Sequence, residues 1–134
     1  MFERWFSRKQ QPLTGAPEVR RQKTYSGQSG YVYQYCYDGR RPYKRDRENG
    51  TEYVFDVSAD RKTSDPVSVL LSDAAIEDWE GRHGRTLHGS ERYAIAKMAL
   101  FQAFDERPGP ASMNTAVRVR AADVEAILIA LGIE

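Results

Sequence analysis

The stretch YVYQYCYD, residues 31–38, decides the fold of this 134-residue chain. Its four tyrosines alternate with other side chains. A period of two is that of a β-strand whose two faces differ, and aromatic residues favour strands, so spacing and composition agree. The tyrosine face is the more apolar one, and we expect it to be buried in the core. An exposed aromatic row can instead stack unpaired bases. Whether the tyrosines are buried or exposed distinguishes these two roles.

Three later segments extend the strand pattern. Residues 51–60 alternate with Tyr53 and Phe55 on one face, and residues 67–71 alternate in the same way. Residues 115–120 alternate again and predict a fourth strand. The first three strands follow one another with short or medium connections, which favours an antiparallel meander.

Three other segments have apolar residues at the helical spacing of about 3.6. They cover residues 72–82, 90–106 and 122–131. Ser72 or Asp73 can cap the first helix and Ser90 the second, and Gly132 fits a left-handed end of the last one. The order β-β-β-α-α-β-α predicts an α+β fold. We expect a three- or four-stranded, mostly antiparallel sheet with the helices packed on its tyrosine-bearing face.

The length is that of one domain. Residues 29–134 are predicted to form a single α+β domain, and residues 1–28 a flexible basic N-terminal tail rich in Gln, Gly and Pro. Residues 19–25 alternate weakly and can add an edge strand to the sheet. The face of the sheet opposite the helices is expected to be polar and uncovered. That face carries Gln34, Asp56 and Ser58, and it can dock a partner or a second copy of the chain.

The chain has one cysteine, Cys36, so it cannot form an intramolecular disulfide or a cysteine-pair metal site. This favours a reducing compartment. No apolar run approaches the roughly 20 residues of a membrane span, and no apolar core follows the basic residues at the start. The expected location is therefore the cytoplasm, and no cofactor or metal is expected.

The net charge of +1 hides an uneven distribution. Residues 1–62 hold 13 Lys or Arg against 8 Asp or Glu, whereas residues 63–134 hold 7 against 11. The charge of the whole chain therefore gives no argument for binding to nucleic acid or to a membrane, and only a local basic surface can support such binding.

Residues 38–50 form the best candidate for such a surface. They are predicted to be a loop of about twelve residues, which is long for a hairpin connection. Arginine side chains in such a loop match phosphate oxygens with paired hydrogen bonds. The alternative is a solvated hairpin tip whose charges serve solubility alone. The residues expected to contact an anionic partner such as nucleic acid are Arg40, Arg41, Tyr43, Lys44, Arg45 and Arg47.

The leading interpretation is a small non-enzymatic binding or interaction module that uses this loop; its partner is nucleic acid or another protein. A second interpretation is a peripheral membrane or assembly protein tethered by an amphipathic segment at residues 1–9, with Phe2, Trp5 and Phe6 in contact with the membrane. A third is a small enzyme that uses His83 and His88 with nearby acidic residues. The spacing of these two histidines matches no recognised metal motif.

Overall fold

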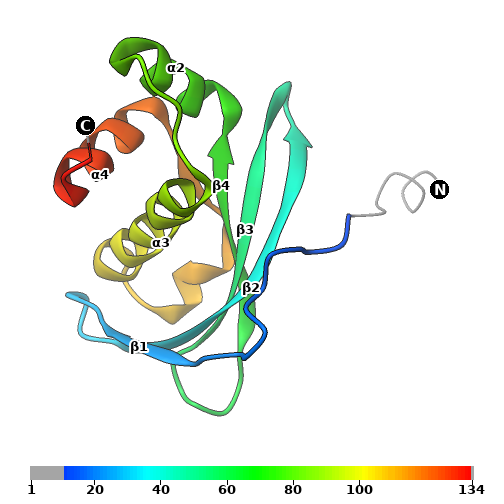
Figure 1. Ribbon diagram of the computed structural model, residues 1–134. Coiled ribbons are helices and arrows are strands. Elements are labelled where there is room, and N and C mark those ends of the chain that lie inside the picture. Colours follow the sequence, from blue (N-terminus) through cyan, green and yellow to red (C-terminus); the bar gives the residue numbers. More distant parts are fainter. Residues whose placement is uncertain (1–10, 134) are drawn as a thin grey trace.

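The computed structural model describes residues 11–133 and contains one sheet with helices on one face (Figure 1). Neighbouring strands in the sheet follow the order of the sequence. The first four strands pair antiparallel, and the fifth pairs parallel with the fourth. The strands are β1 (Lys23–Ser26), β2 (Val32–Arg45), β3 (Glu48–Ser58), β4 (Asp65–Ser72) and β5 (Val117–Val119).

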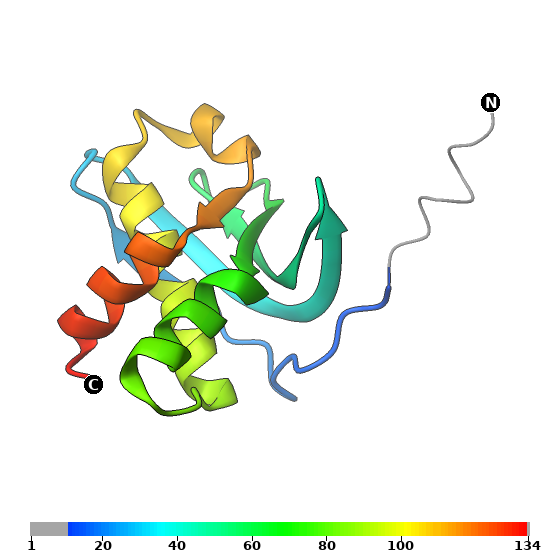
Figure 2. The same ribbon diagram turned by 90° about the horizontal axis from the view of Figure 1, so that it is seen from above.

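The helices lie between β4 and β5 in sequence and at the C-terminus. They are α2 (Asp73–His83), α3 (Gly89–Glu106) and α4 (Ala121–Leu131), with a 3₁₀ helix η1 (Pro110–Asn114) before β5. Helix α3 lies across the concave side of the sheet, with α2 and α4 beside it (Figures 1 and 2). The sheet curls around α3, and the β2–β3 hairpin stands away from the helices (Figure 2).

The α+β class and the helices on the tyrosine face are as predicted, but the sheet is larger. It has five strands among the described residues, not three or four, and it is mixed. Helices α2 and α3 form a crossover from β4 to β5, and a crossover of this kind returns the chain parallel to the strand that it left. The additional strand, β1, lies at the edge of the sheet and overlaps the edge strand expected within residues 19–25, so this part of the predicted tail belongs to the sheet.

The segment 38–50 is not a loop, which corrects the prediction from sequence. Strands β2 and β3 continue through it as one long hairpin, paired from Gln34 and Ser58 to Arg45 and Glu48. The connection is the two residues Asp46 and Arg47, both with positive φ. A two-residue turn with positive φ at both positions has the twist of its flanking strands and closes the hairpin tightly.

A β-bulge in β2 explains why the sequence pattern misleads here. The register with β3 shifts between Tyr37 and Gly39, and Gly39 has a φ of +124°. The shift exchanges the two faces of the strand, because a bulge adds one residue to a two-residue repeat. Tyr37 pairs with Phe55 on the core side, and after the bulge Arg40 pairs with Tyr53 on that same side.

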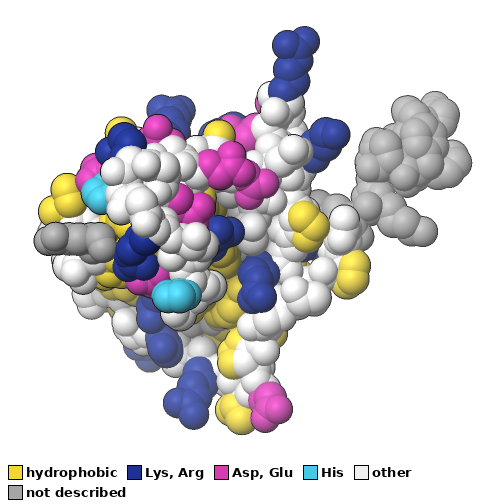
Figure 3. Space-filling view, turned by 45° about the horizontal axis from the view of Figure 1, so that its top comes forward, with side chains coloured by type: hydrophobic (Ala, Val, Ile, Leu, Met, Phe, Trp, Pro, Cys, Tyr) yellow, Lys and Arg dark blue, Asp and Glu magenta, His cyan; other side chains and the backbone are white. Residues whose placement is uncertain are grey.

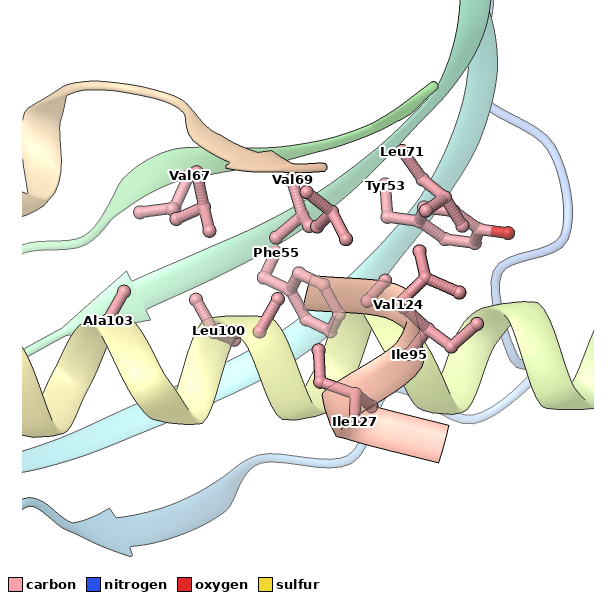
Figure 4. Packing of buried hydrophobic residues seen from close by; sticks show 14 of the residues in the cluster. Tyr53, Phe55, Val67, Val69, Leu71, Ile95, Leu100, Ala103, Val124 and Ile127 are labelled. Atoms are coloured by element: carbon pink, nitrogen blue, oxygen red, sulfur yellow. The ribbon is translucent and has the colours of Figure 1, made fainter. Parts of the chain in front are cut away.

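The core lies between the sheet and the helices (Figure 4). Phe55, Ile95 and Leu100 are fully buried there, and the labelled side chains of β3 and β4 point toward α3. Tyr33 and Tyr35 are buried as well, and the Tyr33 ring stacks on Phe104 with the ring centroids 4.2 Å apart. Tyr33 and Tyr35 are therefore core, as predicted, whereas Tyr37 is half-buried and Tyr31 is exposed.

The ends of the helices largely follow the predicted signals. The Ser72 hydroxyl accepts a hydrogen bond from the Ala75 amide at 3.0 Å and caps α2. Gly132 ends α4 with a φ of +75°. The prediction that Ser90 caps α3 is wrong, because the helix begins at Gly89 and His88 is its N-cap residue. The Glu91 carboxylate accepts the backbone N–H of His88 at 2.8 Å and completes this cap.

The sheet face opposite the helices is less open than predicted. Gln34 and Ser58 are only 6% and 8% exposed. The Ser58 hydroxyl accepts the Arg61 amide of the following turn, which folds back over it. Asp56 is half-buried and ion-paired with Arg20. Docking of a second copy on this face stays a prediction, now for a face that the chain itself partly covers.

Arg47→Gly is expected to raise the free energy of unfolding by about 1 kcal/mol, because glycine adopts the left-handed conformation without the penalty of a side chain. Urea denaturation measures this change. Arg47→Ala is the matched control: it removes the same charge and keeps a Cβ at a φ of +67°. If the alanine variant is stabilised equally, the cause is charge repulsion at the tip and not backbone strain.

Candidate functional site

A cleft of about 690 Å³ opens between the hairpin and the start of α3. Its size lies within the range of small-molecule sites. Three segments far apart in sequence form its walls: residues 15–23, the β2–β3 hairpin, and residues 87–93. In Figure 3, basic side chains gather along the hollow between the helices and the hairpin.

Four tyrosines form the floor and one wall of this cleft. Tyr35 and Tyr53 are buried below it, whereas Tyr37 and Tyr93 are half-buried and supply its accessible aromatic surface. The rings of Tyr37 and Tyr93 lie with their centroids 4.7 Å apart. The Tyr37 hydroxyl is buried and has no hydrogen-bond partner among the described residues. Burial raises the pKa of Tyr37, and the nearby Arg40 guanidinium partly offsets this rise.

Four basic residues also line the cleft, and none of its lining residues is Asp, Glu, His or Cys. The basic residues are Arg21, Lys23, Arg40 and Arg92. Within residues 11–133, Arg21, Lys23 and Arg40 form no ion pair, and Arg92 reaches Glu80 only at 3.5 Å. The Nε–H of Arg92 is buried and likewise lacks a partner in the described part of the chain. The three cations without an ion pair among residues 11–133, beside aromatic rings, suit an anion that carries a planar group.

The segment that we call the strap, residues 11–22, positions part of this wall. Thr14 and Arg40 exchange backbone hydrogen bonds of 2.9 and 2.8 Å, and the Arg40 side chain lies against Gly15. Further along, the Arg20 guanidinium donates to Asp38 at 2.9 Å and to Asp56 at 2.7 Å on the opposite face of the sheet. These contacts hold the strap on the edge of β2 and place Arg21 at the cleft.

A second pair of cations lies beside the cleft on α3 and β1. Tyr93, Lys97 and Phe101 follow one another at a spacing of four residues, so they share one face of α3. Burial lowers the pKa of Lys97, and the neighbouring Lys23 lowers it further. The Lys97 ammonium lies 5.8 Å from the centroid of the Phe101 ring. Two adjacent ammonium groups without a carboxylate destabilise each other until an anion neutralises them.

Lys97→Met is expected to raise the free energy of unfolding by about 0.5 kcal/mol at neutral pH, because it removes this like-charge contact and keeps the apolar stem. The folded state disfavours the charged form of Lys97. The gain in unfolding free energy is therefore fully present below the lowered pKa that Lys97 has in the folded state. It disappears as the pH rises toward the ordinary lysine value of 10.5. Thermal unfolding of both proteins at pH 7 and pH 10.5 measures this; an equal difference at the two pH values would contradict it.

The structure separates the six residues predicted to contact an anionic partner. Arg40 alone of the six lines the cleft. Arg41 is on the other face of β2, where its Nε–H donates to Glu52 at 2.9 Å. Burial favours a raised pKa for Glu52, but hydrogen bonds from Arg41 and Ser68 outweigh it, and the net pKa is lowered. A guanidinium paired in this way is not available to a phosphate.

Tyr43 is likewise engaged on that other face, where its hydroxyl donates to Glu48. Burial and this carboxylate raise the pKa of Tyr43. Lys44, Arg45 and Arg47 are exposed at the end of the hairpin. The predicted set is therefore one arginine in a cleft, two residues bound to carboxylates, and three exposed cations at a tip.

The residues of the two other interpretations lie elsewhere. His83 stacks on Trp79, and its Nε2 is 3.2 Å from the Glu125 carboxylate, whereas His88 is at the start of α3. Residues 11–133 contain no cluster of three or more His, Cys, Asp or Glu able to hold a metal ion. Phe2, Trp5 and Phe6 lie outside the described residues. Of the helices described, none has the length and apolarity to cross a membrane.

Sequence reasoning missed most of the cleft. Tyr93 and Arg92 lie in a predicted helix whose pattern indicates no binding role, and Arg21 and Lys23 lie in the predicted tail. One signal was available: Tyr93 and Lys97 interrupt the apolar face of their helix at a spacing of four residues. Polar or cationic residues on a core-facing stripe indicate that the stripe ends at a solvent-filled space.

Comparisons of this chain with protein-family models, with curated proteins and with solved structures find no match. Its function therefore has to be inferred from the chemistry of its own residues.

Proposed function

We propose that this chain is a binding module whose tyrosine-lined basic cleft holds nucleotide units of a single-stranded nucleic acid. The observation that supports this proposal is the composition of the cleft: four basic residues and four tyrosines, with no acidic residue among its lining residues. Phosphates match the basic groups, and bases match the rings.

A single strand suits this cleft better than a duplex. The accessible rings of Tyr37 and Tyr93 lie inside a concave site, and only an unpaired base can be turned into it. Binding rather than acid–base catalysis is the proposed role, because the lining residues include no carboxylate, imidazole or thiol that would exchange a proton near neutral pH.

Fluorescence anisotropy with labelled ten-nucleotide RNA and DNA, each as single strand and as duplex, tests the proposal at two salt concentrations. We expect saturable binding of the single strands that weakens as salt rises, since phosphate contacts release counterions. The duplexes should bind at least tenfold more weakly. Equal affinity for duplex and single strand, or no binding at low salt, would overturn the proposal.

A further inference from the structure

Of the four basic lining residues, Arg40, Arg92 and Lys23 lie toward the two ends of the cleft, whereas Arg21 belongs to the strap, which runs from one end to the other. At one end, Arg40 follows the bulge in β2, and Arg92 belongs to the first turn of α3. At the other end, Lys23 pairs with Tyr35, and Lys97 is its neighbour on α3. Helix α3 runs opposite to β2, because Tyr93 contacts Tyr37 and Phe101 contacts Tyr35.

The separation of the two ends can be estimated along β2 and along α3. Five residues of β2 separate Arg40 from Tyr35, which is about 15 Å at the rise of an extended strand. Five residues of α3 separate Arg92 from Lys97, which is about 7.5 Å along a helix. The rings of Tyr37 and Tyr93 lie between the two ends.

Two phosphates, one at each end, match this backbone span better than one phosphate shared by both ends. A nucleic-acid strand carries one phosphate per about 3.4 Å when stacked and about twice that when extended. Two to three nucleotides therefore bring one phosphate to each end, and the volume of about 690 Å³ holds a ligand of that size and not a long strand.

We infer that the ligand of this cleft is a segment of two to three nucleotides, with one phosphate held by Arg40 and Arg92 and another by Lys23 and Lys97. The inference rests on the proposed function and adds the length of the segment and the two places of its phosphates. The like-charge contact of Lys23 with Lys97 has a purpose in this arrangement, because the second phosphate neutralises it.

Competition against a labelled single strand measures the length directly, with 5′-phosphorylated oligonucleotides of one, two, three, six and ten residues. Affinity should rise at least tenfold from one nucleotide to three and change less than threefold beyond three, after correction for the number of registers on longer strands. A mononucleotide as tight as the trinucleotide, or affinity that keeps rising to ten, would overturn the inference and leave the proposed function standing. No competition by any length, with no binding of the labelled strand, would remove the proposed function itself.

A pair of variants assigns the two ends. Lys23→Ala with Lys97→Met should lower the affinity for the trinucleotide to that of the mononucleotide and leave the mononucleotide affinity within twofold. Arg40→Ala should weaken both ligands tenfold or more. If the lysine variant binds the trinucleotide as wild type does while its thermal unfolding shows an intact fold, the second phosphate site is absent.

Discussion

Arg21→Ala combined with Arg40→Ala is expected to weaken single-strand binding about 100-fold. Arg40 loses its contact with one of the two phosphates, and Arg21 loses a contact with the strand backbone that passes along the strap between them. Each charge-assisted contact of this kind accounts for about a factor of ten. Both side chains are exposed and form no ion pair among the described residues, so the fold should remain intact. The salt dependence of the remaining affinity should also become shallower, because two counterion-releasing contacts are gone.

The matched control is the pair Arg45→Ala and Arg47→Ala at the tip of the same hairpin. It removes the same two charges and leaves the cleft unchanged, so its affinity should stay within about twofold of wild type. This comparison separates the cleft from the basic tip. If the tip variant loses binding and the cleft variant does not, the hairpin tip is the contact surface and the cleft has another role.

The fold was predictable from sequence where local patterns and packing agree. The alternation of residues 31–38 identifies a buried tyrosine face, and Ser72 and Gly132 mark helix ends through the backbone groups that they satisfy. Strand β1 is indicated only by the weak alternation of residues 19–25, because it has only four residues and Tyr25 alone of them is not exposed. A strand with one partly buried side chain shows almost no alternation of apolar and polar residues.

The course of residues 38–50 was not predictable by the same rules. Gly39, Pro42 and a series of charges are typical of a loop, yet the segment pairs along its whole length. Pro42 is accommodated because this part of β2 has no strand on its other side, so the missing N–H leaves no strand partner unsatisfied. Charged residues are accommodated there because the hairpin projects beyond the core.

Most residues of the cleft could not be predicted, and the reason is different. Arg40, Arg92 and Lys23 are on three elements that are distant in sequence and that the curl of the sheet brings together. The bulge at Gly39 then decides on which face Arg40 lies, and a bulge leaves no repeat in a sequence. A shift of one residue in the register would thus exchange the positions of Arg40, which lines the cleft, and Arg41, which is paired with Glu52.

Gly39→Ala is expected to lower the free energy of unfolding by about 2–3 kcal/mol, because two costs add at this position. A φ of +124° is unfavourable for any residue with a side chain, and a Cβ here would lie 2.7 Å from the Thr14 carbonyl oxygen of the strap. Relief of that clash displaces the strap and with it Arg21, so single-strand affinity should fall several-fold as well. Urea denaturation and anisotropy measure the two effects.

Gly30→Ala separates these two costs. Gly30 also has a positive φ, +96°, but no atom lies within 4 Å of a Cβ built there. This variant should lose only the backbone contribution, about 1 kcal/mol, and should bind a single strand as wild type does. The difference between the two losses of unfolding free energy is then the cost of the clash between the added Cβ and the strap. Equal losses would mean that the strap yields to the added methyl group without cost, and that Arg21 is held at the cleft by the Arg20 ion pairs alone.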